Sequence, residues 1–214
     1  MRVTSRIFHA GRAGRVALAL ALLTPGCSNL LTQSTTSSYV IIDALEASTG
    51  REPDKITGVL NSDVLTYVKK DVGGSTTLVP TIFADNLIAT FRLGMKDPGS
   101  TDSPTKPSTT NYITITRYHV KYIRSDGRAV EGIDVPYAFD GGATGTITPD
   151  GLKLVMTLVR TQSKSEAPLQ ALIGAAASLS TIAEITFYGK DQTGRDVQVV
   201  GRISVNFADW GDPA

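Results

Sequence analysis

The chain is poor in side chains that perform nucleophilic or acid–base chemistry. Its 214 residues include one cysteine, Cys27, and two histidines, of which only His119 follows the first 26 residues. Catalysis by a thiolate or an imidazole needs such groups in a prepared site, and a zinc site needs several nitrogen or sulfur ligands. His119 alternates with apolar residues, so we expect it to face solvent on a strand. No nucleophile-elbow, phosphate-binding, dinucleotide-binding or zinc-protease motif is present. We therefore expect no catalysis, no cofactor and no zinc.

Carboxylates are the only abundant reactive groups, and many of them lie at turn signals. Aspartate supports turns through hydrogen bonds from its side chain to the backbone, which accounts for nearly all of these positions. The alternative is calcium, because loop carboxylates and carbonyls are hard oxygen ligands. The spacing matches no calcium-binding loop, so three residues remain only as weak calcium candidates: Asp126, Asp140 and Asp191.

Two aromatic residues are candidates for contacts with a sugar or a protein. Tyr188 is out of phase with the apolar residues Ile185 and Phe187, so its side chain is expected to face outward. Trp210 lies near the end of the sequence, where it either caps the rim of the core or forms a contact patch; we favour the cap. Most other aromatic residues of the middle strands, Tyr137 included, are expected to be in the core or half-buried.

The first 26 residues have the composition of an export signal. They contain four arginines and no acidic residue, and an apolar stretch runs from Val16 to Leu23. That stretch is far shorter than the roughly 20 residues that span a bilayer, but it fits the hydrophobic region of a signal peptide. We expect residues 1–26 to be removed and the remaining protein to act outside the cytoplasm.

Leu23-Thr-Pro-Gly-Cys27 resembles the lipobox of bacterial lipoproteins, with Gly26 suited to the position before the cysteine. The resemblance implies cleavage before Cys27, attachment of diacylglycerol to its sulfur, and acylation of the new amine by a fatty acid such as palmitate. Residues 27–38 would then form a lipidated, flexible tether, because they end in small polar residues. Ordinary signal cleavage, with Cys27 incidental, is the alternative.

The charge that remains after residue 26 argues against one class of partner. Removing four arginines from 21 basic residues leaves 17, against 20 acidic ones, for a net charge of −3. Nucleic-acid binding needs a clustered basic surface. We therefore expect a membrane contact through the lipid, together with an envelope protein or glycan as partner, and no nucleic acid.

From residue 39 onward the dominant hydrophobic period is two, which predicts antiparallel strands. Val72-Gly-Gly-Ser75 predicts the tip of a hairpin, and the phase change in 112–124 predicts a β-bulge near Thr116–Arg117. A single short helix is expected near 166–173, where leucines and isoleucine have helical spacing and Gly174 follows.

The order of the strands from about residue 86 resembles an immunoglobulin or fibronectin type III domain, most clearly in Arg117–Gly127 and in Ile185–Phe207. The resemblance implies one all-β, antiparallel sandwich over 39–214, with 49–82 as an N-terminal hairpin extension. The whole chain also resembles lipoproteins of Gram-negative bacteria, which implies a location at the membrane; we expect the outer membrane, on its periplasmic or surface face. We expect a binding or structural module; the alternatives are a hydrolase whose carboxylate pair forms only in the fold, and a carbohydrate-binding module.

Overall fold

The computed structural model describes residues 36–211, so residues 1–26, Cys27 and most of the expected tether lie outside the described part. Within 36–211 the chain is built almost entirely from strands, which are β1 (Ser38–Ser48), β2 (Val59–Asp63), β3 (Thr66–Val72), β4 (Ser75–Thr81), β5 (Asp85–Met95), β6 (Ile113–Arg124), β7 (Phe139–Ile147), β8 (Leu152–Val159), β9 (Ser178–Asp191) and β10 (Asp196–Ala208). The helices there are short: α2 (Thr161–Lys164) and the 3₁₀ turns η1 (Thr109–Asn111) and η2 (Leu169–Leu172). No helix in 36–211 has the length and apolarity to cross a membrane.

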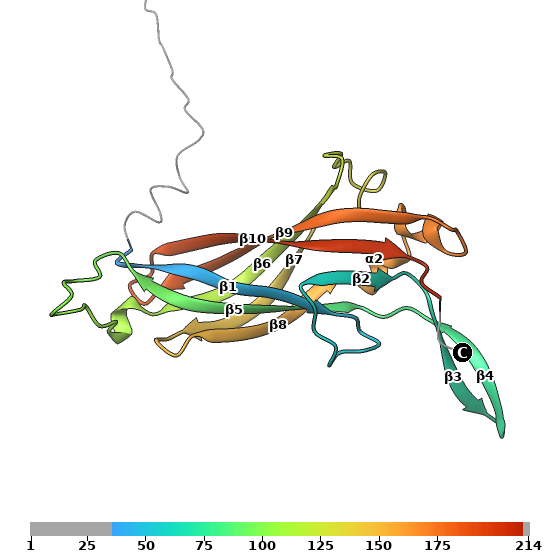
Figure 1. Ribbon diagram of the computed structural model, residues 1–214, viewed down its shortest axis with the longest axis horizontal. Coiled ribbons are helices and arrows are strands. Elements are labelled where there is room, and N and C mark those ends of the chain that lie inside the picture. Colours follow the sequence, from blue (N-terminus) through green and yellow to red (C-terminus); the bar gives the residue numbers. More distant parts are fainter. Residues whose placement is uncertain (1–35, 212–214) are drawn as a thin grey trace, which may run out of the picture.

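Two sheets pack face to face, as Figure 1 shows. One sheet has the order β1-β5-β8, and the other has the order β2-β10-β9-β6-β7. This arrangement confirms the all-β sandwich, in which the sheet of β1, β5 and β8 lies opposite the sheet that holds the hairpin β9–β10. All strand pairs are antiparallel except β2 with β10, which is parallel.

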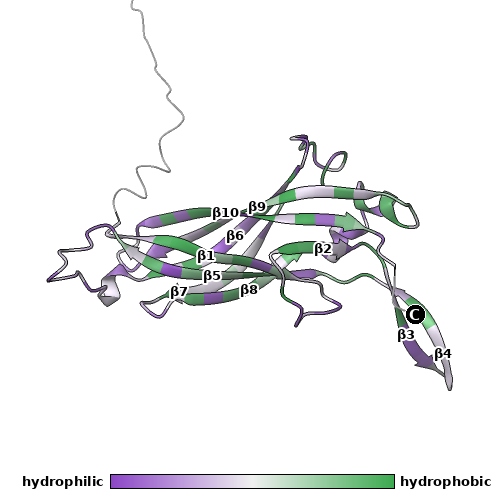
Figure 2. Ribbon diagram, in the orientation of Figure 1, coloured by the Kyte–Doolittle hydropathy of each residue, from purple (hydrophilic) through white to green (hydrophobic). Residues whose placement is uncertain are grey.

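Alternation along the strands places the apolar residues between the sheets. Figure 2 shows hydrophobic and hydrophilic residues alternating along β9 and β10. In the core, Phe91 of β5 packs edge-on against Phe187 of β9, with ring centroids 4.9 Å apart. Both rings are fully buried, so they fix the separation of the two sheets by direct contact.

The β-bulge in β6 is confirmed. The register of β6 shifts between Ile115 and Arg117 against both of its neighbours, β7 and β9. The extra residue, Thr116, lets the buried set change from odd to even positions, so that Ile115 and Tyr118 both face the core.

The hairpin expected within 49–82 is present as β3 and β4, which pair only with each other and project from the body (Figure 1). The sequence did not predict that the same segment also supplies β2. Val59 to Asp63 extend the larger sheet in register with Ser204 to Ala208, so part of the expected extension is a strand of the sandwich.

The helical segment is broken into two pieces. Of the expected helix at 166–173, residues Leu169–Leu172 form a 3₁₀ turn directly after Pro168, and a separate four-residue α-helix precedes it. Proline lacks an N–H group and disfavours a helical residue before it, which explains the break. Buried Leu169 anchors the turn to the core.

The sandwich has two distinct ends. At the first, Ser38 donates a hydrogen bond through Oγ to the carbonyl of Asn111, just before β6 begins. At the other, called here the far end, β1 finishes at Ser48, β6 finishes at Arg124, and Ala208 of β10 pairs with Ser178. The chain therefore enters the sandwich at the end opposite the loops that follow β1, β6 and β10.

Candidate functional site

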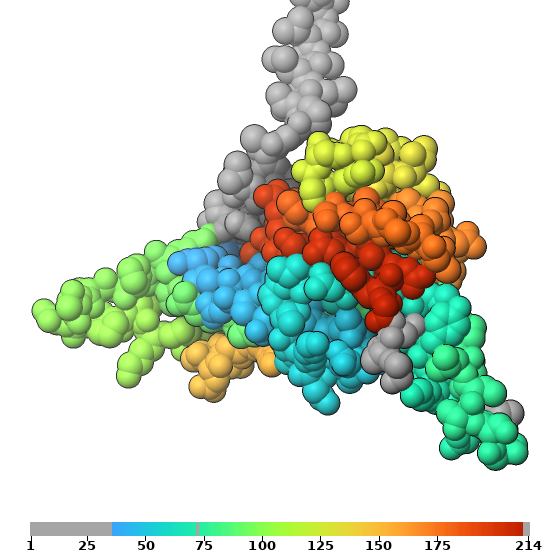
Figure 3. All heavy atoms as spheres, turned by 45° about the vertical axis from the view of Figure 1, so that its right-hand side comes forward, coloured from blue at the N-terminus to red at the C-terminus, as the bar shows by residue number. Residues whose placement is uncertain are grey.

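A loop at the far end carries three exposed apolar side chains. This β6–β7 loop, residues 125–138, joins Arg124 to Phe139 and stands out from the body in Figures 1 and 3. Ile133 is 72% exposed, Val130 is 55% exposed and Tyr137 is 46% exposed. Single exposed apolar residues are common on any surface, but three on one projecting loop make this loop the candidate contact site.

Buried residues and backbone hydrogen bonds hold the loop in one shape. Val135 is fully buried beneath it, and the carbonyl of Val130 accepts hydrogen bonds from the N–H groups of Ile133, Asp134 and Val135. Gly132 has a φ of +73° and lies directly under the ring of Tyr137. Only glycine fits there easily, because a side chain would meet both a strained backbone and the tyrosine hydroxyl.

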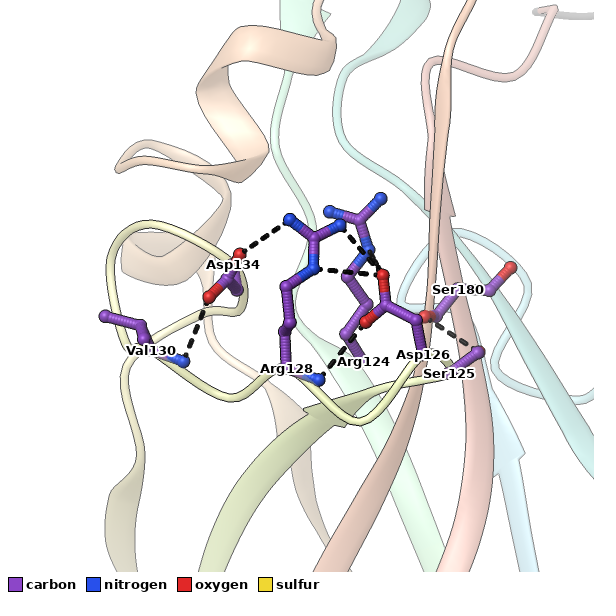
Figure 4. A network of polar contacts seen from close by, with 7 residues as sticks. All are labelled: Arg124, Ser125, Asp126, Arg128, Val130, Asp134 and Ser180. Atoms are coloured by element: carbon purple, nitrogen blue, oxygen red, sulfur yellow. Dashed lines mark hydrogen bonds and ion pairs between the residues drawn. The ribbon is translucent and has the colours of Figure 1, made fainter.

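Arg128 braces the loop by bridging two of its carboxylates, as Figure 4 shows. Its Nη2 lies 2.8 Å from Asp126 Oδ2, and its Nη1 lies 3.3 Å from Asp134 Oδ1. The second oxygen of Asp134 accepts a hydrogen bond from the N–H of Val130 at 3.4 Å. Arg124 adds a further contact, with its Nε 3.3 Å from Asp126 Oδ2. One guanidinium thus joins the start of the loop to the backbone that carries Val130.

These contacts favour the charged forms of the network. Hydrogen bonds from the Arg128 side chain, and then from its backbone, lower the pKa of Asp126 below its usual value. The hydrogen bond to Asp126 correspondingly raises the pKa of Arg128. Asp126 and Arg128 therefore stay ionised at every pH near neutrality.

The three calcium candidates lie apart and already have other partners. Asp126 is held by arginines, as above. Asp140 lies 3.2 Å from Nδ1 of His119 and 3.5 Å from Nη1 of Arg117. Asp191 closes the β9–β10 turn, where its Oδ1 accepts hydrogen bonds from the N–H groups of Thr193 and Arg195. Over residues 36–211, no group of three or more potential metal ligands comes together.

Burial acts on the pKa of Asp191 in the opposite direction to its hydrogen bonds. Burial alone would raise this pKa, but the donors in the turn outweigh it, and the pKa of Asp191 is lowered. The residue thus has the role of a turn aspartate, one of the two alternatives that the sequence left open.

The two aromatic candidates differ in what they offer to a ligand. Tyr188 is on the outer face of β9, but the Arg117 guanidinium lies 3.9 Å from its ring centroid and covers one ring face. Trp210 is 41% exposed at the far end, and its backbone N–H donates to Asp63 Oδ1. Trp210 therefore presents a more accessible aromatic surface than Tyr188.

The apolar loop itself was not identified from the sequence. Tyr137 lies on this loop and not among the half-buried residues of the sheet. The available signal was the stretch Ala129–Val135, where apolar residues and Gly132 follow neither a strand nor a helix period. In comparisons with known proteins, no family model, curated protein or solved structure matches this chain.

Proposed function

We propose that this protein is a membrane-tethered, extracytoplasmic lipoprotein that binds a partner protein of the cell envelope through the β6–β7 loop. The observation that carries the proposal is the braced loop with its exposed Val130, Ile133 and Tyr137. Full burial of a valine or isoleucine side chain contributes about 1.5–3 kcal/mol. Because the loop is already held in shape by Arg128, little conformational entropy is lost when a partner covers it.

A protein partner fits the loop better than a lipid surface does. Glu131 is exposed between Val130 and Ile133, and insertion of this loop into a bilayer would carry a carboxylate toward hydrocarbon. Strand β1, which begins at Ser38 beside Asn111, starts at the opposite end of the sandwich (Figure 1). A tether that starts at Cys27 would thus attach the membrane to the end of the sandwich that lies opposite the loop.

The partners of Asp85 support binding over hydrolysis. A hydrolase would need two facing carboxylates, one of them free to accept or donate a proton. Asp85, the most buried carboxylate near a far-end cavity, is already bound by Lys164, Ser62 and the N–H of Gly50. The ion pair and the two hydrogen bonds hold it as a structural group.

The loop is tested by site-specific photocrosslinking in cells that export the full chain. A benzophenone amino acid replaces Ile133 in one variant, and replaces Val155, which is 66% exposed on β8, in a matched control. We expect a discrete protein adduct at position 133, absent at 155 and reduced when Arg128→Ala is added. Adducts with lipid alone, or equal labelling at both positions, would contradict the proposal; an adduct with a second copy would identify the partner as this chain itself.

The anchor is tested separately by metabolic labelling with a fatty acid. Labelling of the wild-type protein and its loss in Cys27→Ala are expected, together with release of the variant from the membrane. Several acyl chains, at about 0.8 kcal/mol for each buried methylene, suffice for stable anchoring. Unchanged labelling of Cys27→Ala would refute lipidation at this residue.

A further inference from the structure

A cavity of about 300 Å³ opens at the far end, away from the β6–β7 loop. It lies among the segment after β1, strand β2, the segment that leads into β5, helix α2 and the residues after β10. The lining residues that bear on its chemistry are Asn61, Asp63, Phe83, Asp85, Lys164 and Trp210. Its size is at the small end of ligand pockets, which suits one small molecule.

Lys164 supplies an unusual donor to the wall of this cavity. Its side chain is 1% exposed, and its Nζ lies 2.8 Å from Asp85 Oδ2 in an ion pair. An ammonium group carries three N–H donors, so two remain for other acceptors. Buried donors without an acceptor are costly, and an oxygen atom of a ligand in the cavity would satisfy them.

Two aromatic and two polar side chains also line the cavity. Trp210 and Phe83 both border the cavity, and the hydrogen bond from the Trp210 N–H to Asp63 Oδ1, 3.1 Å long, positions the tryptophan backbone. Asn61 offers amide N–H donors, while its Oδ1 accepts a hydrogen bond from Asn206 Nδ2. Both oxygens of Asp63 already accept hydrogen bonds, from the Trp210 N–H and from Thr66 Oγ1. A ligand that suits this wall has an apolar face and several groups that both donate and accept hydrogen bonds.

The charges around the cavity balance. Three cationic residues (Arg51, Lys55 and Lys164) and three anionic residues (Glu52, Asp63 and Asp85) line it. A site for an anion or a cation would have an excess of the opposite sign. The balance, the aromatic surface and the donor of Lys164 together match a neutral polyhydroxylated ring.

From these features we infer that the far-end cavity binds one neutral sugar residue. A CH-rich face of the sugar would lie against Trp210, and a hydroxyl oxygen would accept from Lys164 Nζ. This site is independent of the β6–β7 loop, so a partner protein and a sugar are bound by different residues. Affinity for a single ring in so open a site is expected on the order of 1 mM in Kd.

Trp210 is the only tryptophan in the chain, so its fluorescence reports directly on the cavity. Titrations of the wild-type protein with glucose, galactose and N-acetylglucosamine are expected to give a saturable change for at least one of them. Phosphate and acetate serve as anionic probes and are expected to give none. Asn61→Ala, a change of an exposed residue, should weaken binding about fivefold through the loss of one hydrogen bond.

Calorimetry with the same sugar tests the aromatic contact. Trp210→Ala is expected to abolish measurable binding, whereas Tyr188→Ala, a matched aromatic change on the outer face of β9, should leave the Kd unchanged. Thermal unfolding of each variant excludes loss of the fold as the cause. No saturable response to any of the three sugars, a response to phosphate or acetate alone, or full binding by Trp210→Ala would overturn the inference.

Discussion

Lys164 Nζ lies 2.8 Å from Asp85 Oδ2, and each of these side chains is 1% exposed. The same carboxylate accepts hydrogen bonds from Ser62 Oγ at 2.6 Å and from the N–H of Gly50 at 3.1 Å. One buried ion pair, with its two hydrogen bonds, therefore joins the first residue of β5 to helix α2, to β2 and to the segment after β1. It holds in place the irregular segments that enclose the far-end cavity.

Lys164→Met should destabilise the protein by about 3–5 kcal/mol, because it leaves the Asp85 carboxylate buried without its cation. Urea unfolding followed by circular dichroism measures the change. The double variant Asp85→Asn with Lys164→Met removes the uncompensated charge while keeping an acceptor for Gly50, and it should recover at least about 1 kcal/mol. A double variant less stable than the single one would show that the charge is not the cause.

Gly132→Val should loosen the β6–β7 loop. The residue has a φ of +73° and lies against Tyr137, so a branched side chain costs about 1–3 kcal/mol of backbone strain before any clash is counted. Limited proteolysis should become faster at residues 125–138. Gly142→Val is the matched control, since that glycine in β7 has ordinary φ and open space around its Cα; equal rates for the two variants would contradict a strained position.

Arg128→Met should raise amide exchange at Asp134 and Val135 while leaving the core strands protected. The guanidinium bridges Asp126 and the nearly buried Asp134, and its loss leaves Asp134 without an ionic partner. Hydrogen exchange measured by mass spectrometry resolves the loop peptide. Lys190→Met removes an exposed pair with Asp196 and is expected to change little. Unchanged exchange in Arg128→Met would mean that the backbone alone orders the loop.

Glu184→Gln should flatten the dependence of stability on pH in the acid range. Hydrogen bonds from Lys121 and then from Arg202 lower the pKa of Glu184 below its ordinary value of 4.5, with contacts of 2.7 Å to each. A carboxyl with a lower pKa in the folded state contributes stability above its unfolded pKa and loses it as pH falls through the folded pKa. Unfolding free energies of the wild type should therefore fall below about pH 4.5 more steeply than those of the variant. Asp150→Asn, at an exposed turn, is the control, and parallel curves for wild type and Glu184→Gln would refute this assignment.

Phe91→Ala should cost about 3–5 kcal/mol through the cavity that it leaves between the sheets. The expected loss applies to the whole sandwich, because Phe91 and Phe187 make the contact between β5 and β9. Chemical unfolding should shift to lower denaturant without a change of slope. A loss below about 1 kcal/mol would mean that the core repacks around the missing ring.

The sandwich was predictable because its physical cause is local. In β9 and β10 the apolar core residues recur at every second position, as in Ala183, Ile185 and Phe187 and in Ile203, Val205 and Phe207, so the alternation is visible in the sequence, and the slip at Thr116 is visible as a change of phase. Strand β2 was not predictable in this way. Five residues with Ser62 and Leu60 as their buried members show little pattern, and the parallel partner, β10, is about 145 residues away.

The candidate sites were likewise predictable only where their cause is local in the sequence. Trp210 could be singled out from its type and position, but its cavity depends on Asp85 and Lys164, which only the folded chain brings together. The apolar loop was missed because Val130, Ile133 and Tyr137 have no periodic spacing that would identify a shared surface, and only the folded loop, with Gly132 and Arg128, places all three on it.

The placement of β1 also has a mechanical consequence. Ten residue pairs join β1 to β5, from Ser38 with Met95 to Ser48 with Asn86, and the hydrogen bonds of an antiparallel pair lie across the strands. A pull on the N-terminal end, resisted by a partner held at the far end, runs along β1 and loads these bonds together in shear. Bonds loaded together yield less easily than bonds opened one at a time, so the fold is suited to remain intact under tension between two attachment points.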